Sequence, residues 1–211
     1  MNFKLKGLAL SISLAVATIS ASAQVNRCAV LEHEAYLEKQ NPKRAQQRAS
    51  FEQRAAAFTT KMAASKTTMP NVTIPVVVHV MHTGGAVGTI YNPTDAQIIG
   101  AIDYLNQVFA GTYPGMTSPV EGGGVVDMEV QFALAQRTPS CGSTNGIDRV
   151  DASGLTNYTA NGINVNNATG CPELTMKNLA RWTTSNYYNI WLVNKIDGAD
   201  GTSGQFIAGF A

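Results

Sequence analysis

The sequence predicts a mixed α/β fold in which a buried strand is backed by the helix that follows it. The strand prediction rests on Val76 to Val80, a β-branched run interrupted only by His79. A run this apolar, without polar alternation, is typical of a strand covered on both faces. A helix is the weaker alternative, because consecutive valines lose rotamer freedom in a helix and suit a pleated surface.

The backing helix is predicted from Thr94 to Phe109. Thr94 and Gln97 have the spacing of a capping box, and Asp95 suits the positive end of a helix. Gly111 supplies a stop signal. The apolar residues that recur at helical spacing are Ile98, Ile102, Leu105 and Phe109.

Two further strands are predicted to complete a twisted mixed sheet with the first strand inside it. Residues 126–135 alternate between apolar and polar side chains, which indicates one buried and one wet face. A third strand is predicted from Tyr187 to Val193. Residues 137–172 are rich in loop-forming residues, and Pro172 is suited to begin a short helix through Ala180.

Residues 1–23 are predicted to be a signal peptide. Lys4 and Lys6 precede an apolar stretch over residues 7–19, and Ala21 and Ala23 form a small-x-small cleavage site. The apolar stretch is short for a membrane span, so an uncleaved anchor is the weaker alternative. A lipidated Cys28 is also disfavoured, because it lies beyond the apolar core. We therefore expect a secreted protein without a membrane span.

Residues 24–71 are predicted to be helical, from Ala29 to Gln40 and again from Pro42 to about Ala64. They are either a pro-segment that covers residues 72–211 until it is cut away, or an ordinary N-terminal helical pair. The second helix carries a narrow apolar stripe, which needs another surface to pack on. The stripe consists of Phe51, Ala55, Phe58 and Met62.

Charge is unevenly distributed between these parts. Residues 24–70 hold eight Lys/Arg and four Asp/Glu, a net charge of +4, whereas residues 71–211 hold five Lys/Arg and ten Asp/Glu, a net charge of −5. The basic segment is therefore suited to dock on the acidic part. The acidic part makes nucleic acid an unsuitable partner.

Because export leads to an oxidising setting, the three cysteines of the chain can form disulfides. Cys141 and Cys171 lie in loop-rich sequence of the same region and are the predicted disulfide pair. Cys28 is then left over. It follows Arg27, and a neighbouring cation favours the thiolate that binds zinc. The alternatives for Cys28 are an intermolecular disulfide or an idle thiol.

The histidines and acidic turns do not form an evident metal site. His79 and His82 are three apart on a strand and point to opposite faces, so they cannot share one ion without a bulge. His79 is predicted to be a core histidine with a satisfied ring, and His33 to be solvated on its helix. Asp197 and Asp200 flank glycines in a turn, and calcium is the ion that such carboxylates would bind, but fewer than six oxygens are in evidence.

Several stretches, taken in order, resemble the N-terminal half of the pappalysin-type metzincin zinc proteases. Arg27-Cys28-Ala29 also resembles the cysteine-switch region that precedes the catalytic domain in secreted bacterial members. The matching stretches of residues 72–211 are Ile74–Met81, Asp95–Phe109, Val130–Ala135, Asn145–Arg149 and Tyr187–Asn194.

The resemblance implies a secreted metalloendopeptidase that acts on proteins or peptides and uses zinc. In the family, zinc is held by three histidines of a His-Glu-x-x-His-x-x-Gly-x-x-His motif, whose Glu is the general base. This chain lacks the motif, and no histidine follows His82. The resemblance thus implies the N-terminal part of the catalytic domain, incomplete at its C-terminus and inactive alone, with Cys28 a zinc ligand in the precursor. The alternatives are a non-enzymatic secreted α/β binding module and an inactive truncated paralogue.

Overall fold

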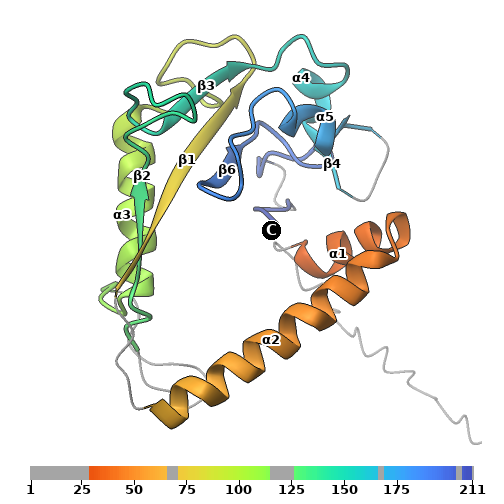
Figure 1. The fold of residues 1–211 in the computed structure, drawn as a ribbon. Helices are drawn as coiled ribbons and strands as arrows, with labels where there is room; N and C mark the ends of the chain where they lie inside the picture. The colour runs from red at the N-terminus through yellow and green to blue at the C-terminus, as the bar shows by residue number, and fades with distance from the viewer. Residues whose placement is uncertain (1–28, 66–70, 115–125, 166–168, 203–205, 211) are drawn as a thin grey trace, which may run out of the picture.

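The computed structural model describes residues 29–65, 71–114, 126–165, 169–202 and 206–210. The predicted signal peptide and Cys28 lie outside these residues. Figure 1 shows a sheet backed by one long helix, a loop-rich lobe beside it, and a pair of N-terminal helices. The helices are α1 (Val30–Gln40), α2 (Lys43–Ser65), α3 (Asp95–Phe109), α4 (Tyr158–Asn161) and α5 (Glu173–Lys177). The strands are β1 (Val72–His82), β2 (Val130–Leu134), β3 (Ile147–Asp151), β4 (Ile163–Asn164), β5 (Cys171–Pro172) and β6 (Tyr188–Leu192).

β1 is the centre of the main sheet. It pairs with β2 over residues 72–76, with β3 over residues 78–82 and with β6 over residues 76–80, and each pairing is parallel. Because the β6 register overlaps the other two, β6 must lie on the opposite edge of β1. The residues from Val76 to Met81 are all buried, which confirms the prediction of a strand covered on both faces. The described pairings of this sheet are parallel, where the sequence predicted a mixed sheet.

β2 and β3 follow one another along the same edge of β1. The Ala135 amide donates to the Val76 carbonyl, and the Val78 amide donates to the Gly146 carbonyl, at 2.8 and 2.9 Å. These bonds continue the ladder while residues 136–145 leave it as a loop. Gly146 has φ of +75°, and a Cβ there would lie 2.7 Å from the Ala135 amide nitrogen. The loop can therefore close only over a glycine.

α3 covers one face of the sheet, as the sequence predicted. The Thr94 side chain accepts a hydrogen bond from the Gln97 amide, and the Gln97 side chain accepts one from the Thr94 amide, so the capping box is formed. The buried residues of α3 pack against alternate residues of β1. This cluster contains Val76, Val78, Val80, Ile98, Ile102 and Phe132.

The second predicted strand is shorter than expected. The strand begins at Val130 rather than at residue 126, although apolar and polar residues alternate from residue 126 onward. The Glu129 amide donates to the Asp127 side chain at 2.8 Å, and Glu129 has φ of +55°. This turn breaks the extended backbone, because a positive φ is incompatible with a strand. Val126 and Met128 are consequently 70% and 61% exposed.

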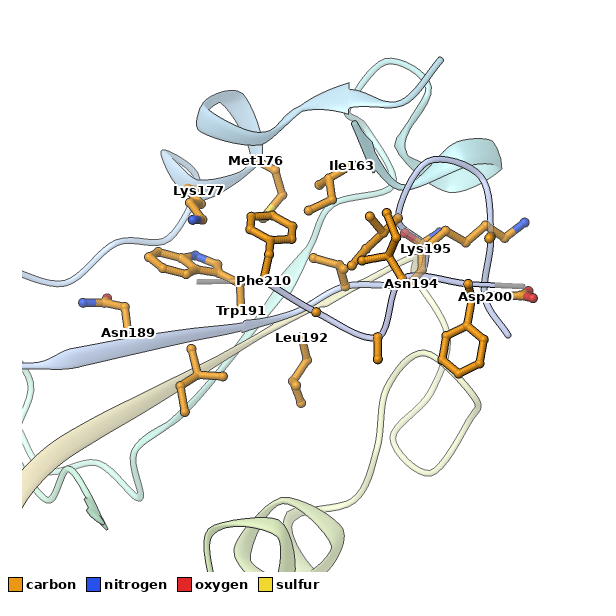
Figure 2. Close-up of a pocket in the computed structure, with 18 of the residues that line it drawn as sticks. Ile163, Met176, Lys177, Asn189, Trp191, Leu192, Asn194, Lys195, Asp200 and Phe210 are labelled. Atoms are coloured by element: carbon orange, nitrogen blue, oxygen red, sulfur yellow. The ribbon is translucent and has the colours of Figure 1, made fainter. Parts of the chain in front are cut away.

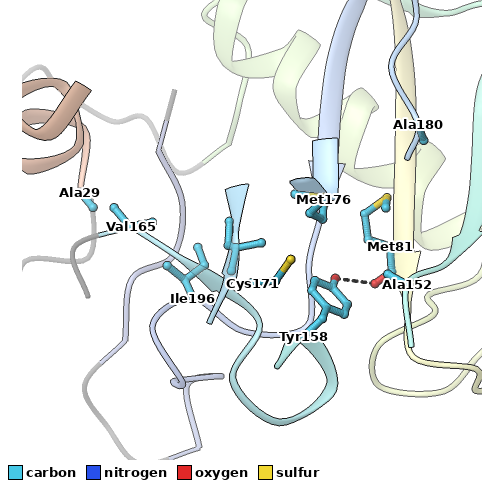
Figure 3. Packing of buried hydrophobic residues seen from close by; sticks show 10 residues of the cluster. Ala29, Met81, Ala152, Tyr158, Val165, Cys171, Met176, Ala180 and Ile196 are labelled. Atoms are coloured by element: carbon cyan, nitrogen blue, oxygen red, sulfur yellow. Dashed lines mark hydrogen bonds between the residues drawn. The ribbon is translucent and has the colours of Figure 1, made fainter. Parts of the chain in front are cut away.

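Residues 137–172 contain more regular structure than the sequence predicted, namely β3, α4, β4 and β5. They supply half of the buried residues of a second core at the end of β1, where the Tyr158 hydroxyl donates to the Met81 carbonyl at 2.6 Å (Figure 3). The predicted helix from Pro172 to Ala180 is present only as α5. Members of this core include Met81, Ala152, Tyr158, Ile163, Cys171 and Met176.

The N-terminal helices match their predicted bounds to within a few residues. α2 runs clear of the sheet in Figure 1, and Phe51 and Phe58 of its apolar stripe are exposed. Arg44 and Arg48 form ion pairs with Glu34 and Glu38 of α1. The two helices are thus tied to each other by charge. No helix within the described ranges is long and apolar enough to cross a membrane.

Asn106 of α3 caps the outer edge of β2, and its removal should destabilise the fold. Its side chain donates to the Phe132 carbonyl at 2.9 Å and accepts from the Phe132 amide at 2.7 Å. We expect Asn106→Ala to lower the free energy of unfolding by about 1–3 kcal/mol, because two partly buried backbone groups lose their partner. Urea denaturation measures this. Gln107→Ala, on the same helix, is the control and should cost less than about 0.5 kcal/mol.

Candidate functional site

A pocket of about 680 Å³ lies along β6 and the chain that follows it (Figure 2). Every residue from Tyr188 to Ile196 contributes to its wall, and residues 206–210 also line it. α5 contributes Met176 and Lys177. The lining is mainly apolar, with the large side chains Trp191, Leu192, Val193, Ile196, Phe206 and Phe210.

β6 offers a polar backbone edge beside this apolar pocket. One edge of β6 is paired with β1, and none of the described strands pairs with its other edge. An unpaired strand edge presents N–H and C=O groups that can hydrogen-bond an extended peptide. The combination can hold a peptide backbone along β6 and an apolar side chain in the pocket.

Lys177 provides a cation at the rim of the pocket. Its Nζ lies 4.8 Å from the Trp191 ring centroid and 5.7 Å from that of Phe210, within the range of cation–π contact. Lys177 also forms an ion pair with Glu173, one helical turn earlier. The sequence analysis did not single out these residues, because they become neighbours only through the fold.

Asp200 closes the turn at the other end of the pocket. Its carboxylate accepts hydrogen bonds from the Thr202 side chain, the Thr202 amide and the Tyr91 hydroxyl. These bonds lower the pKa of Asp200 to about 2, and the bond from the Thr202 side chain has the largest effect. Tyr91 precedes α3, so this contact ties the pocket to the helix side of the domain.

His79 lies behind the pocket wall and is fully buried, as predicted. Its Nδ1 is 2.9 Å from Oδ2 of Asp148 in β3, and its Nε2 is 2.8 Å from Oδ1 of Asn189 in β6. Its ring stacks on Trp191, with centroids 5.4 Å apart. The Asn189 amide is itself fixed by the backbone of Trp182. Each ring nitrogen has a partner, so His79 is a structural residue that holds the β6 side chains in place.

Asn194 forms the floor where β6 ends. Its Nδ2 donates to the carbonyls of Tyr158 and Thr159, at 3.1 and 3.2 Å. The Asn194 Oδ1 is buried and has no hydrogen-bond partner among the described residues. Burial raises the pKa of the Tyr158 hydroxyl, so this group stays a neutral donor.

The N-terminal helix α1 begins against this pocket. The Ala29 amide donates to the Gly209 carbonyl at 3.4 Å, and Ala29 is buried. The His33 ring lies 4.2 Å from the Phe210 ring, and its Nε2 is 3.1 Å from a Glu173 carboxylate oxygen. The prediction of a solvated His33 was therefore wrong, because its partners lie more than a hundred residues away in the sequence.

The described residues do not fit a complete metal site. They contain no group of three or more His, Cys, Asp or Glu side chains that could hold an ion. The carboxylate of Asp197 accepts from the Val165 amide at 2.8 Å, and that of Asp200 is occupied as described above. Both aspartate side chains thus stabilise turns, and the described residues offer zinc no cluster of His, Cys, Asp or Glu ligands.

The predicted disulfide between Cys141 and Cys171 is not formed in the structure. Both cysteines are free thiols, one exposed and the other buried. Cys141 lies in the tight turn of the loop between β2 and β3, with φ of +67°. Cys171 belongs to the second core, where burial raises its pKa. Membership of one loop-rich stretch did not imply proximity, because β3 and α4 separate the two.

No family model and no curated protein matches the sequence. Among solved structures, the chain is similar to mirolysin in complex with compound 9 (29% identity, TM-score 0.44) and to mature mirolysin from Tannerella forsythia in complex with a cleaved peptide (29%, 0.43). Each match covers 59% of this chain and 43% of the other. A mutant of Tannerella forsythia promirolysin is 26% identical over 78% of this chain and 49% of that chain, with a TM-score of 0.44. The chain thus spans less than half of these proteins.

The free thiols give a direct check of this geometry. We expect Cys141 to react with iodoacetamide in the folded chain, because it is exposed, and Cys171 to react only after unfolding, because it is buried and its pKa is raised. Peptide mapping by mass spectrometry without reduction measures both. A Cys141–Cys171 peptide in that map would contradict the structure and restore the predicted disulfide.

Proposed function

We propose that this chain is the N-terminal portion of a secreted zinc metalloendopeptidase precursor of the pappalysin type. Residues 1–23 direct export, residues 24–71 are a pro-segment, and residues 72–211 are the N-terminal part of the catalytic domain. The observation that carries the proposal is the assembly of the stretches on which the resemblance rests. Ile74–Met81 and Tyr187–Asn194, the two most distinctive, lie in adjacent strands with His79 in register with Trp191.

The other stretches of the resemblance support the same assembly. Val130–Ala135 and Asn145–Arg149 contribute β2 and β3, which continue along the far edge of β1. Asp95–Phe109 is the backing helix. Stretches that are weak signals singly thus form one sheet and its covering helix, which is the expected product of a shared domain.

The proposed substrate is an extended segment of a protein or peptide. The edge of β6 that none of the described strands pairs with suits main-chain hydrogen bonds, and the apolar pocket suits a hydrophobic side chain of the bound segment. Such binding recognises the main chain of the substrate at every position but its side chains at only a few. An endopeptidase that acts within varied sequences requires this kind of recognition. The role of this chain in the enzyme is therefore to bind and orient the substrate.

The position of α1 supports the proposal of a latent precursor. Ala29 and His33 contact Gly209 and Phe210, which line the pocket, so the start of α1 lies against the proposed substrate site. Cys28 directly precedes Ala29 in the sequence. We assign Cys28 as the thiolate ligand of zinc in the precursor. The other ligands, and the metal chemistry that cleaves peptide bonds, belong to the full-length enzyme and are not among the described residues.

A second candidate is a secreted binding module without enzymatic activity. The observation that favours it is the combination of a peptide-sized pocket with no catalytic ligand set in the described residues. The two functions differ in whether a peptide that binds β6 is also cut. The 211-residue chain alone should leave such a peptide intact under either function. Only a cleavage assay on a precursor that includes the zinc motif can distinguish the two functions.

The decisive variant is Cys28→Ala in that full-length precursor, assayed before processing with a quenched fluorescent peptide. We expect measurable hydrolysis or early self-cleavage, because the zinc loses a ligand that excludes water. Cys141→Ala, which removes an exposed thiol of the same chain, is the matched control and should remain as latent as the unmutated precursor. If the Cys28→Ala and Cys141→Ala precursors are equally inactive and mature at the same rate, Cys28 is not a zinc ligand in the precursor. Absence of activity even after residues 24–71 are removed would refute the enzymatic function.

A further inference from the structure

We infer that His33 is an acid-sensitive latch that holds α1 against the pocket. The imidazole is 2% exposed and lies in the contact between the N-terminal helix and the rest of the protein. It packs on Phe210 at 4.2 Å between ring centroids, and Nε2 is 3.1 Å from Glu173. Beside it, the Ala29 amide at the N-cap of α1 donates to the Gly209 carbonyl at 3.4 Å. A buried titratable side chain thus lies in the contact between α1 and the pocket.

The charged groups around His33 come from three helices. Glu173 and Lys177 face it from α5, Glu34 from α1 itself, and Arg44 from α2. From the C-terminal segment, the Phe210 ring packs on His33. Glu173 is shared, because it also pairs with Lys177. Glu173 acts most strongly among these charges, and the two cations only partly offset the two carboxylates, so burial is what favours the neutral ring.

The hydrogen bonds of the ring favour its neutral form. Nε2–H can donate to the Glu173 carboxylate, which leaves Nδ1 as the bare nitrogen. Nδ1 is buried and has no hydrogen-bond partner among the described residues. Protonation would place a second N–H there, and a buried donor without an acceptor is costly. The docked state is thus built around a ring that carries one proton.

The direction of the pKa shift agrees with this geometry. Burial of His33 lowers its pKa below the ordinary 6.5, and Lys177 and Arg44 add to the lowering, while Glu173 and Glu34 oppose it. Because the His33 ring has the lower pKa in the docked state, its contribution to docking is fully present above pH 6.5, where the ring is neutral in the docked and the undocked state. That stability is lost as the pH falls below 6.5, until the docked ring is itself protonated.

The consequence for activation rests on the proposed function, because only a precursor has a pro-segment to release. In that setting, mild acid would loosen α1 from the pocket without breaking a covalent bond. The latch itself is a property of this chain and needs no enzymatic activity to be observed. Failure of the protease proposal would therefore leave the latch intact, and failure of the latch would leave the protease proposal intact.

Hydrogen exchange of the complete chain tests the latch. The protection of residues 30–40, corrected for the intrinsic exchange rate, is compared at pH 7.5, 6.5 and 5.5. We expect α1 protection to fall below pH 6.5 by up to about tenfold per pH unit, the limit for one proton. Protection of α3 serves as the internal reference and should stay constant. An α1 protection that does not change with pH would overturn the inference.

Two variants identify the titrating group. His33→Gln keeps a donor for Glu173 but does not titrate, so α1 protection should become independent of pH between 7.5 and 5.5. His82→Gln, which alters a histidine outside this interface, should retain the pH dependence of the unmutated chain. If His33→Gln leaves α1 unprotected at every pH, the ring nitrogens of His33 are titrated by NMR in the unmutated chain. A midpoint below 6.5 that coincides with loss of α1 protection supports the latch, and a midpoint at or above 6.5 overturns it.

Discussion

Every strand of the main sheet depends on β1, because β2, β3 and β6 all hydrogen-bond to it and it fills the space between them. This constraint explains why the strand is apolar on both faces: α3 covers one side, and the second core begins at Met81 on the other. The partners of β1 come from residues 130, 147 and 188 onward, so their pairing closes long loops whose entropy only a well-buried strand can offset.

The one polar side chain in the middle of β1 links this scaffold to the candidate site. His79 lies between Asp148 and Asn189 and stacks on Trp191, which forms part of the pocket wall. Asn189 in turn holds the backbone of Trp182. The orientation of the wall is therefore set from behind by partly buried hydrogen bonds, and the pocket can remain apolar toward its ligand. Buried polar groups of this kind are costly unless every member has a partner.

The parts of the fold that the sequence predicted correctly are those whose cause is local. The valine run of β1 and the Thr94–Gln97 capping box need no distant partner to be recognised, and both are present. The start of β2 was missed because the turn at Glu129 overrides the alternation. The candidate site was mostly missed, because Lys177, Phe210 and His33 meet only after folding. Cys28, the one predicted site residue of the N-terminal segment, remains a prediction.

The most direct test of this account is the stability of a His79→Leu variant. Leucine suits a buried strand position, but it leaves Asp148 and Asn189 without the ring that joins them. We predict a loss of about 2–4 kcal/mol in the free energy of unfolding, measured by urea denaturation, because two partly buried polar groups lose their partner. His82→Leu on the same strand should change it by less than about 0.5 kcal/mol. A His79→Leu chain as stable as the unmutated one would contradict the claim that this histidine holds β3 and β6 to β1.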